Sequence, residues 1–90
     1  MRITEKDLQA TCDCINRMLD TPLEPYTQAE GKLVANVGCY HLDHDYGDVA
    51  LHQMDNARGG VRDILGGHLT KRELYERMHA FIKGIEEVKK

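Results

Sequence analysis

The chain has 90 residues, and its 15 acidic and 12 basic side chains give a formal net charge of −3. This acidic balance disfavours non-specific binding to nucleic acid or to a membrane surface as the main activity. No apolar run approaches the ~20 residues that span a bilayer, and the chain has no serine, which excludes a serine nucleophile.

A first amphipathic helix is predicted over residues 3–20. Thr4 is a good N-cap, and Asp7 stands three residues later, as in a capping box. Pro22 prevents the helix from continuing much further. One apolar stripe follows the helical period and consists of Leu8, Cys12, Ile15 and Leu19.

The middle of the chain is predicted to form a small antiparallel sheet. Residues 21–31 are expected to be a linker, in which residues 26–28 are a candidate for a short third strand. A β-hairpin is predicted over residues 32–54, with strands at 33–42 and 49–54 and the turn within DHDYGD. Alternation places Leu33, Ala35, Val37, Cys39 and His41 on one face of the first strand, unless a bulge at Gly38 exchanges the faces.

A glycine-rich loop is predicted over residues 55–69, with one helical turn at 61–65 between two glycine pairs. A second helix is predicted over residues 70–88, capped by Thr70 and Glu73. Its apolar stripe consists of Leu74, Met78, Phe81, Ile85 and Val88. An adjoining strip of Tyr75, His79 and Ile82 either widens the buried face or meets a second subunit. The predicted fold is a single α+β domain over residues 1–90, with two to three strands in the order α-β-β-β-α.

The functional surface is expected between Gly38 and Arg72, because six of the eight glycines and four of the five histidines lie between Gly38 and His68. GGHLTKR brings glycines to a helix N-terminus with two cations in its first turn, a pattern that suits a phosphate group. The competing interpretation is an ordinary capped helix with a solvated first turn. The residues predicted to bind an anionic, nucleotide-like ligand are Tyr40, His41, Tyr46, Arg58, Gly59, Gly60, Arg62, Gly67, His68, Lys71 and Arg72.

A metal or thiol centre is an alternative built on Cys39 and His41. Asp43 lies on the same strand face and joins them in a possible zinc site, for which further ligands would come from His44, Asp45, His52 or His68. The sequence contains no C-x-x-C or H-x-x-x-H spacing, however, and nothing in it shows a third residue that would orient His41 as a base for Cys39. The sequence therefore predicts no catalytic residue, no metal ligand and no cofactor, and an enzyme is disfavoured.

Three segments, GCYHLDHDYGDVALHQM, GGVRDIL and GGHLTKRELYERMHAFIKG, resemble small uncharacterised proteins encoded by tailed phages and prophages. The resemblance covers most of the chain after Pro25, and KRELY and YHL are its most specific parts. In that pattern a second glycine follows Gly47, where this chain has Asp48. The resemblance implies a non-enzymatic accessory protein of the host bacterial cytoplasm, acting in host takeover or counter-defence. Such a protein would block a host protein or sequester a nucleotide-like ligand.

The predicted element order is also similar to that of double-stranded RNA-binding domains, in which basic residues at the start of the last helix contact phosphate. Lys71 and Arg72 stand at that place. The chain departs from the pattern in its acidic balance and in the three aspartates of its central turn, Asp43, Asp45 and Asp48. Binding of duplex RNA is therefore an alternative function rather than the leading one.

A homo-oligomer is expected, since a chain of this length buries only about 60 to 65% of the surface that its unfolded form exposes. The cysteines are odd in number, Cys12, Cys14 and Cys39, and no apolar leader follows Met1. Free thiols in a reducing, cytoplasmic compartment are therefore expected. No membrane partner is expected.

Overall fold

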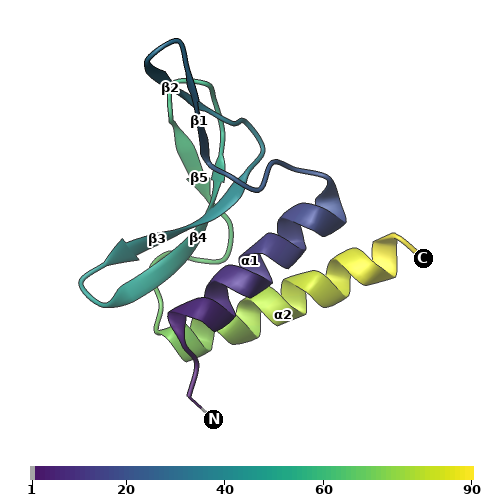
Figure 1. Ribbon diagram of the computed structural model, residues 1–90. Coiled ribbons are helices and arrows are strands. Elements are labelled where there is room, and N and C mark those ends of the chain that lie inside the picture. Colours follow the sequence, from purple (N-terminus) through teal and green to yellow (C-terminus); the bar gives the residue numbers. More distant parts are fainter. Residues whose placement is uncertain (1) are drawn as a thin grey trace.

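The computed structural model describes residues 2–90, in which two helices cover one face of a three-stranded sheet and a second small hairpin projects beyond it (Figure 1). The elements in chain order are α1 (Glu5–Leu19), β1 (Tyr26–Ala29), β2 (Lys32–Ala35), β3 (Tyr40–Asp45), β4 (Asp48–Met54), β5 (Val61–Asp63) and α2 (Lys71–Val88). The predicted α+β class is confirmed. The predicted number of strands is too low, because the order is α-β-β-β-β-β-α in two antiparallel sheets.

Both predicted helices are confirmed to within two residues at their ends, and both begin with a capping box. The Thr4 hydroxyl accepts the Asp7 N–H at 3.2 Å, and the Asp7 carboxylate accepts the Thr4 N–H at 2.8 Å. Thr70 and Glu73 repeat this arrangement at the start of α2. Within residues 2–90, no helix is long and apolar enough to cross a membrane.

The main core lies between the helices and the three-stranded sheet. α1 packs against β3, and α2 packs against β4 and α1. The fully buried side chains at this interface are Leu8, Cys12, Ile15, Val49, Leu51, Leu74 and Met78. Of the strip that adjoins the α2 stripe, Tyr75 and Ile82 are half-buried against this core, whereas His79 is exposed and lies 4.3 Å from the Tyr75 ring. Val88, predicted to continue the stripe, is 85% exposed.

The single long strand predicted at residues 33–42 is wrong, because the chain bends between β2 and β3. Gly38 has a φ of 96°, which few other residues tolerate. The Asn36 side chain donates to the Glu24 carbonyl at 2.9 Å and to the Thr27 hydroxyl at 2.9 Å. These bonds tie the end of β2 to the start of β1, so the candidate third strand at residues 26–28 exists, but in a separate sheet with β2.

The helical turn predicted at residues 61–65 is also wrong, since residues 61–63 form β5. The Asn56 side chain accepts the Arg58 and Gly60 N–H groups at 3.0 and 3.1 Å, which closes a tight turn after β4. The chain then returns along the edge of β4, with Val61 opposite Met54. A helical turn here would leave the backbone groups on this edge of β4 without sheet partners.

A two-residue turn of Tyr46 and Gly47 joins β3 to β4, because Asp45 pairs with Asp48. Both turn residues have positive φ, 48° and 88°, as a type I′ hairpin turn requires. Tyrosine is an unfavourable choice for this conformation, and the Tyr46 side chain is fully exposed.

Tyr46→Asn should therefore raise the free energy of unfolding by about 1 kcal/mol, because asparagine tolerates the left-handed conformation better than tyrosine. Urea denaturation followed by circular dichroism measures this change. Gly47→Ala is the control of opposite sign and should destabilise the hairpin. A Tyr46→Asn variant no more stable than the parent would contradict the assigned turn.

Candidate metal centre

The three-stranded sheet has one face that the helices do not cover. Successive side chains of a strand point to opposite faces, and Tyr40 of β3 and Leu51 of β4 point into the helix-covered core. The intervening residues lie on the other side, which we call the open face. It carries His41 and Asp43 of β3 and His52 of β4, and His52 pairs directly with His41 across the strands.

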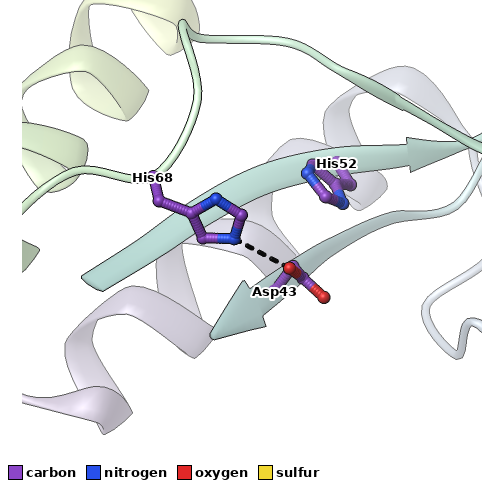
Figure 2. A group of neighbouring side chains, drawn as sticks. All are labelled: Asp43, His52 and His68. Carbon is purple, nitrogen blue, oxygen red and sulfur yellow. Dashed lines mark hydrogen bonds and ion pairs between the residues drawn. The ribbon is translucent and has the colours of Figure 1, made fainter. Parts of the chain in front are cut away.

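Three potential metal ligands meet on the open face, as Figure 2 shows. His68 Nε2 lies 2.8 Å from Asp43 Oδ2, and the rings of His52 and His68 have centroids 5.9 Å apart. One ligand atom from each of Asp43, His52 and His68 lies within 4.8 Å of the other two. The Asp43 and His68 side chains are 49% and 31% exposed, so an ion in solution can reach them.

His68 is brought to this face by the connection between β5 and α2. The next residue, Leu69, forms an antiparallel bridge with Val49, with two backbone hydrogen bonds of 2.9 Å. Just before His68, the Asp63 carboxylate accepts the N–H groups of Gly66 and Gly67 at 2.9 and 2.8 Å. Both glycines have positive φ, 100° and 90°, and this turn reverses the chain toward β4.

The charge states around the cluster suit metal binding. The hydrogen bond from His68 holds the pKa of Asp43 below its usual value, with smaller contributions from the charges of His52 and His41. Burial lowers the pKa of His41, and the neighbouring His52 lowers it further. Asp43 is thus an anion and His41 a neutral imidazole at neutral pH, which are the forms that bind metals.

The alternative centre of Cys39 and His41 is not formed. Cys39 packs against α1, where its Sγ lies 4.0 Å from Asn16 Nδ2 and 3.4 Å from the Tyr40 carbonyl oxygen. Burial raises the pKa of Cys39 to about 11 and that of Cys12 to about 12. Both thiols are therefore protonated at neutral pH and are poor nucleophiles and poor metal ligands.

The residues predicted to surround one anion are divided between the two ends of β4. Leu69 pairs with Val49 near the start of this strand, whereas the turn at residues 55–60 follows its last residue, Met54. At about 3.4 Å per residue, Val49 and Met54 are about 17 Å apart. The Val49 end holds Tyr46, Gly67, His68, Lys71 and Arg72, and the Met54 end holds Arg58, Gly59, Gly60 and Arg62. Tyr40 pairs with Gln53 next to the Met54 end, and His41 pairs with His52 between the two ends, on the opposite face of β3 from Tyr40.

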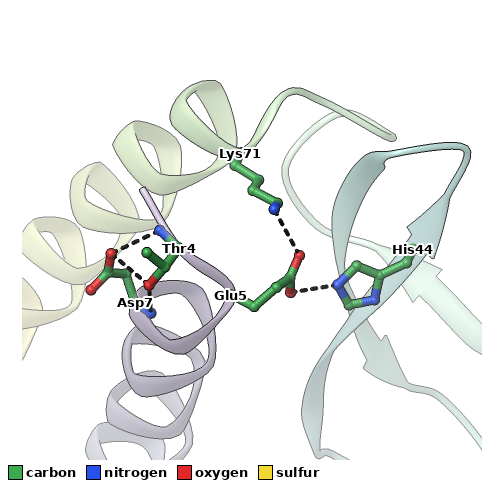
Figure 3. A network of polar contacts seen from close by, with 5 residues as sticks. All are labelled: Thr4, Glu5, Asp7, His44 and Lys71. Atoms are coloured by element: carbon green, nitrogen blue, oxygen red, sulfur yellow. Dashed lines mark hydrogen bonds and ion pairs between the residues drawn. The ribbon is translucent and has the colours of Figure 1, made fainter. Parts of the chain in front are cut away.

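Several groups that an anion would need already have partners. Asp63, itself an anion, accepts the N–H groups of Gly66 and Gly67. Lys71 Nζ lies 3.4 Å from Glu5 Oε1, and Glu5 Oε2 lies 2.8 Å from His44 Nε2 (Figure 3). The bond from His44, followed by that from Lys71, lowers the pKa of Glu5. Arg62 Nε donates to the Gln53 side chain at 2.8 Å.

Tyr40 faces an apolar groove instead of the open face. Its ring lies 6.0 Å from that of Phe81, and both line a groove of about 640 Å³ beside the C-terminal half of α2. The open face and this groove lie on opposite sides of the sheet. The structure thus separates Tyr40 from His41, which were both expected to bind one ligand.

The sequence predictions grouped Asp43 with Cys39 and His41, and gave His52 and His68 as further ligands of that centre. His68 was also assigned to the anion site. One signal in the sequence could have identified them. Strand alternation places His41 and Asp43 on one face of β3, and the pairing of His41 with His52 places His52 of β4 on the same face. No local signal indicated that the loop before α2 would carry His68 to the same face. Comparisons with protein-family models, with curated proteins and with solved structures found no match for this chain.

Proposed function

We propose that the protein binds a divalent transition-metal ion, with zinc as the best fit, through Asp43, His52 and His68. The observation that carries the proposal is the convergence of two imidazoles and a carboxylate, from β3, β4 and the β5–α2 connection, on an accessible face. Imidazole nitrogen and carboxylate oxygen are the usual ligands of zinc in proteins that offer no thiolate.

Only a small adjustment separates this geometry from coordination. Two ligand atoms bound to one tetrahedral zinc ion lie about 3.3 Å apart, given bond lengths of about 2.0–2.2 Å. His68 Nε2 and Asp43 Oδ2 are 2.8 Å apart, so the ion would replace their hydrogen bond with a small outward movement. Protons compete with the ion for the imidazole and carboxylate ligands, so binding is stronger at neutral pH than in acid.

This proposal replaces an anion with a cation as the leading ligand. It is compatible with the accessory role that the phage resemblance implies, in which the protein would hold a ligand rather than transform it. We also propose the host bacterial cytoplasm as its compartment, because Cys12, Cys14 and Cys39 are free thiols.

Isothermal titration of the tag-free protein with zinc should give one ion per chain. His68→Ala and His52→Ala should each weaken binding by about tenfold or more, since loss of even an indirect partner of a metal ligand costs about 10–100-fold. Zinc in excess should raise the melting temperature of the parent protein, because it binds the folded state.

His44→Ala is the matched control. His44 also belongs to β3 and is exposed, but it pairs with Glu5 of α1 and not with the cluster. Its zinc affinity should equal that of the parent. Absence of zinc binding by the parent, or equal affinity in His68→Ala, would contradict the proposal.

A further inference from the structure

His41 carries a polar atom that the fold leaves without a partner. Its Nε2 is the one buried side-chain nitrogen or oxygen, among residues 2–90, that makes no hydrogen bond. Such atoms are rare in folded proteins, because burial without a partner costs free energy. This unpaired nitrogen lies beside the imidazole of His52 and near the carboxylate of Asp43, where a bound ion would give it a partner.

The sheet register places His41 at a corner of the proposed site. It pairs with His52 across the strands, and their ring centroids are 6.0 Å apart. It precedes Asp43 by two residues on the same strand, so both side chains lie on the open face. Ala50 of β4 lies directly opposite Asp43, and its small side chain leaves room on the open face. His68 bonds to Asp43 from the β4 side of the sheet.

The four side chains are therefore neighbours on one face of the sheet. Asp43, His52 and His68 already converge, and His41 stands next to His52 at the edge of this group. Cross-strand and same-face neighbours in a sheet are about 5 and 7 Å apart at their β-carbons. At these spacings, a change in the His41 side-chain torsions is the movement that would bring its Nε2 toward the other three ligand atoms.

We propose that His41 is the fourth ligand of the ion, which completes a set of three imidazoles and one carboxylate. This inference rests on the proposed function, because it concerns the same ion. Four protein ligands in tetrahedral geometry leave no position for water or substrate, which is the pattern of zinc sites that hold their ion rather than use it for catalysis. A site with this fourth ligand therefore binds its ion without using it for catalysis.

Cobalt(II) is the probe, because it substitutes for zinc and its visible absorption reports coordination number. One equivalent of cobalt added to the tag-free parent protein should give the intense visible bands of a four-coordinate ion. His41→Ala should still bind one equivalent, about tenfold or more weakly, and should show the weak bands of a five- or six-coordinate ion that has recruited water.

Two further variants keep the test decisive. His41→Phe preserves the ring volume without a ligand atom, so it should fold in the absence of metal and give the same weak cobalt spectrum. His79→Ala removes an exposed histidine of α2 and should match the parent. If the His41 variants retain the intense bands and the parent affinity, the fourth ligand is refuted while the metal site stands. If the parent binds no cobalt and no zinc, the site itself is refuted.

Discussion

Replacing Asn16 with leucine should lower the free energy of unfolding by about 3 kcal/mol, because it removes the partners of buried backbone groups. The Asn16 side chain is fully buried at the end of α1. Its Oδ1 accepts the Tyr40 N–H at 2.8 Å, and its Nδ2 donates to the Tyr40 carbonyl at 2.8 Å. Oδ1 also accepts the Thr21 hydroxyl at 2.7 Å. Leucine has a similar volume but satisfies none of these groups.

Urea denaturation followed by circular dichroism measures the loss. The matched control is Gln9→Leu, which removes an exposed amide from the same helix, one that donates only to Asp13. That change should alter stability by less than about 0.5 kcal/mol. A stability of Asn16→Leu within about 1 kcal/mol of the parent would show that the amide does not hold β3 against α1.

Leu51→Ala should destabilise the protein by about 3 kcal/mol, within the range of 2–5 that buried leucines give. Leu51 is fully buried in the middle of β4 and belongs to the main core between the helices and the sheet. A domain of this size has a small core, so few neighbouring side chains can move into the resulting cavity. The same substitution at Leu33, which is 70% exposed on β2, provides the control.

Thermal and urea unfolding of both leucine variants give the comparison. Leu33→Ala should cost less than about 1 kcal/mol, since little apolar area is withdrawn from water there. If the two variants were equally stable, β4 would not be the centre of the core. Zinc at saturation should restore part of the stability of Leu51→Ala if the metal site remains formed.

The helices were predictable because their signals are local. Thr4 with Asp7 and Thr70 with Glu73 identify each start, and the apolar period identifies each buried face. The strands were less predictable. The β-branched residues at 33–42 favour an extended chain, but the bend at Gly38 depends on the bonds of Asn36 to residues of a different segment.

Dependence on a distant segment also explains why β5 was not predicted. Residues 61–65 have no strong intrinsic preference, and the glycine pairs beside them are compatible with a helical turn or a strand. The available edge of β4 decides the matter, since pairing there satisfies backbone groups of both strands. Pairing partners that are distant in sequence cannot be found from the period of a short segment.

The candidate site shows a similar division. A functional surface between Gly38 and Arg72 was expected from composition, and the proposed ligands all lie within this range. The expected anion pocket depended on distances between loops, and β4 places those loops about 17 Å apart. The phage resemblance, the accessory role and the homo-oligomer stay predictions.

By itself the sequence determined the two capped helices, the α+β class and the stretch that is rich in histidine and aspartate, because these follow from residues within a few positions of one another. Only the tertiary structure decided that Asp43, His52 and His68 meet and that His41 stands beside them. Strand register sets which side chains share a face, and the Leu69 bridge to Val49 sets where the last loop crosses it. Both depend on backbone hydrogen bonds between segments that are far apart in the chain.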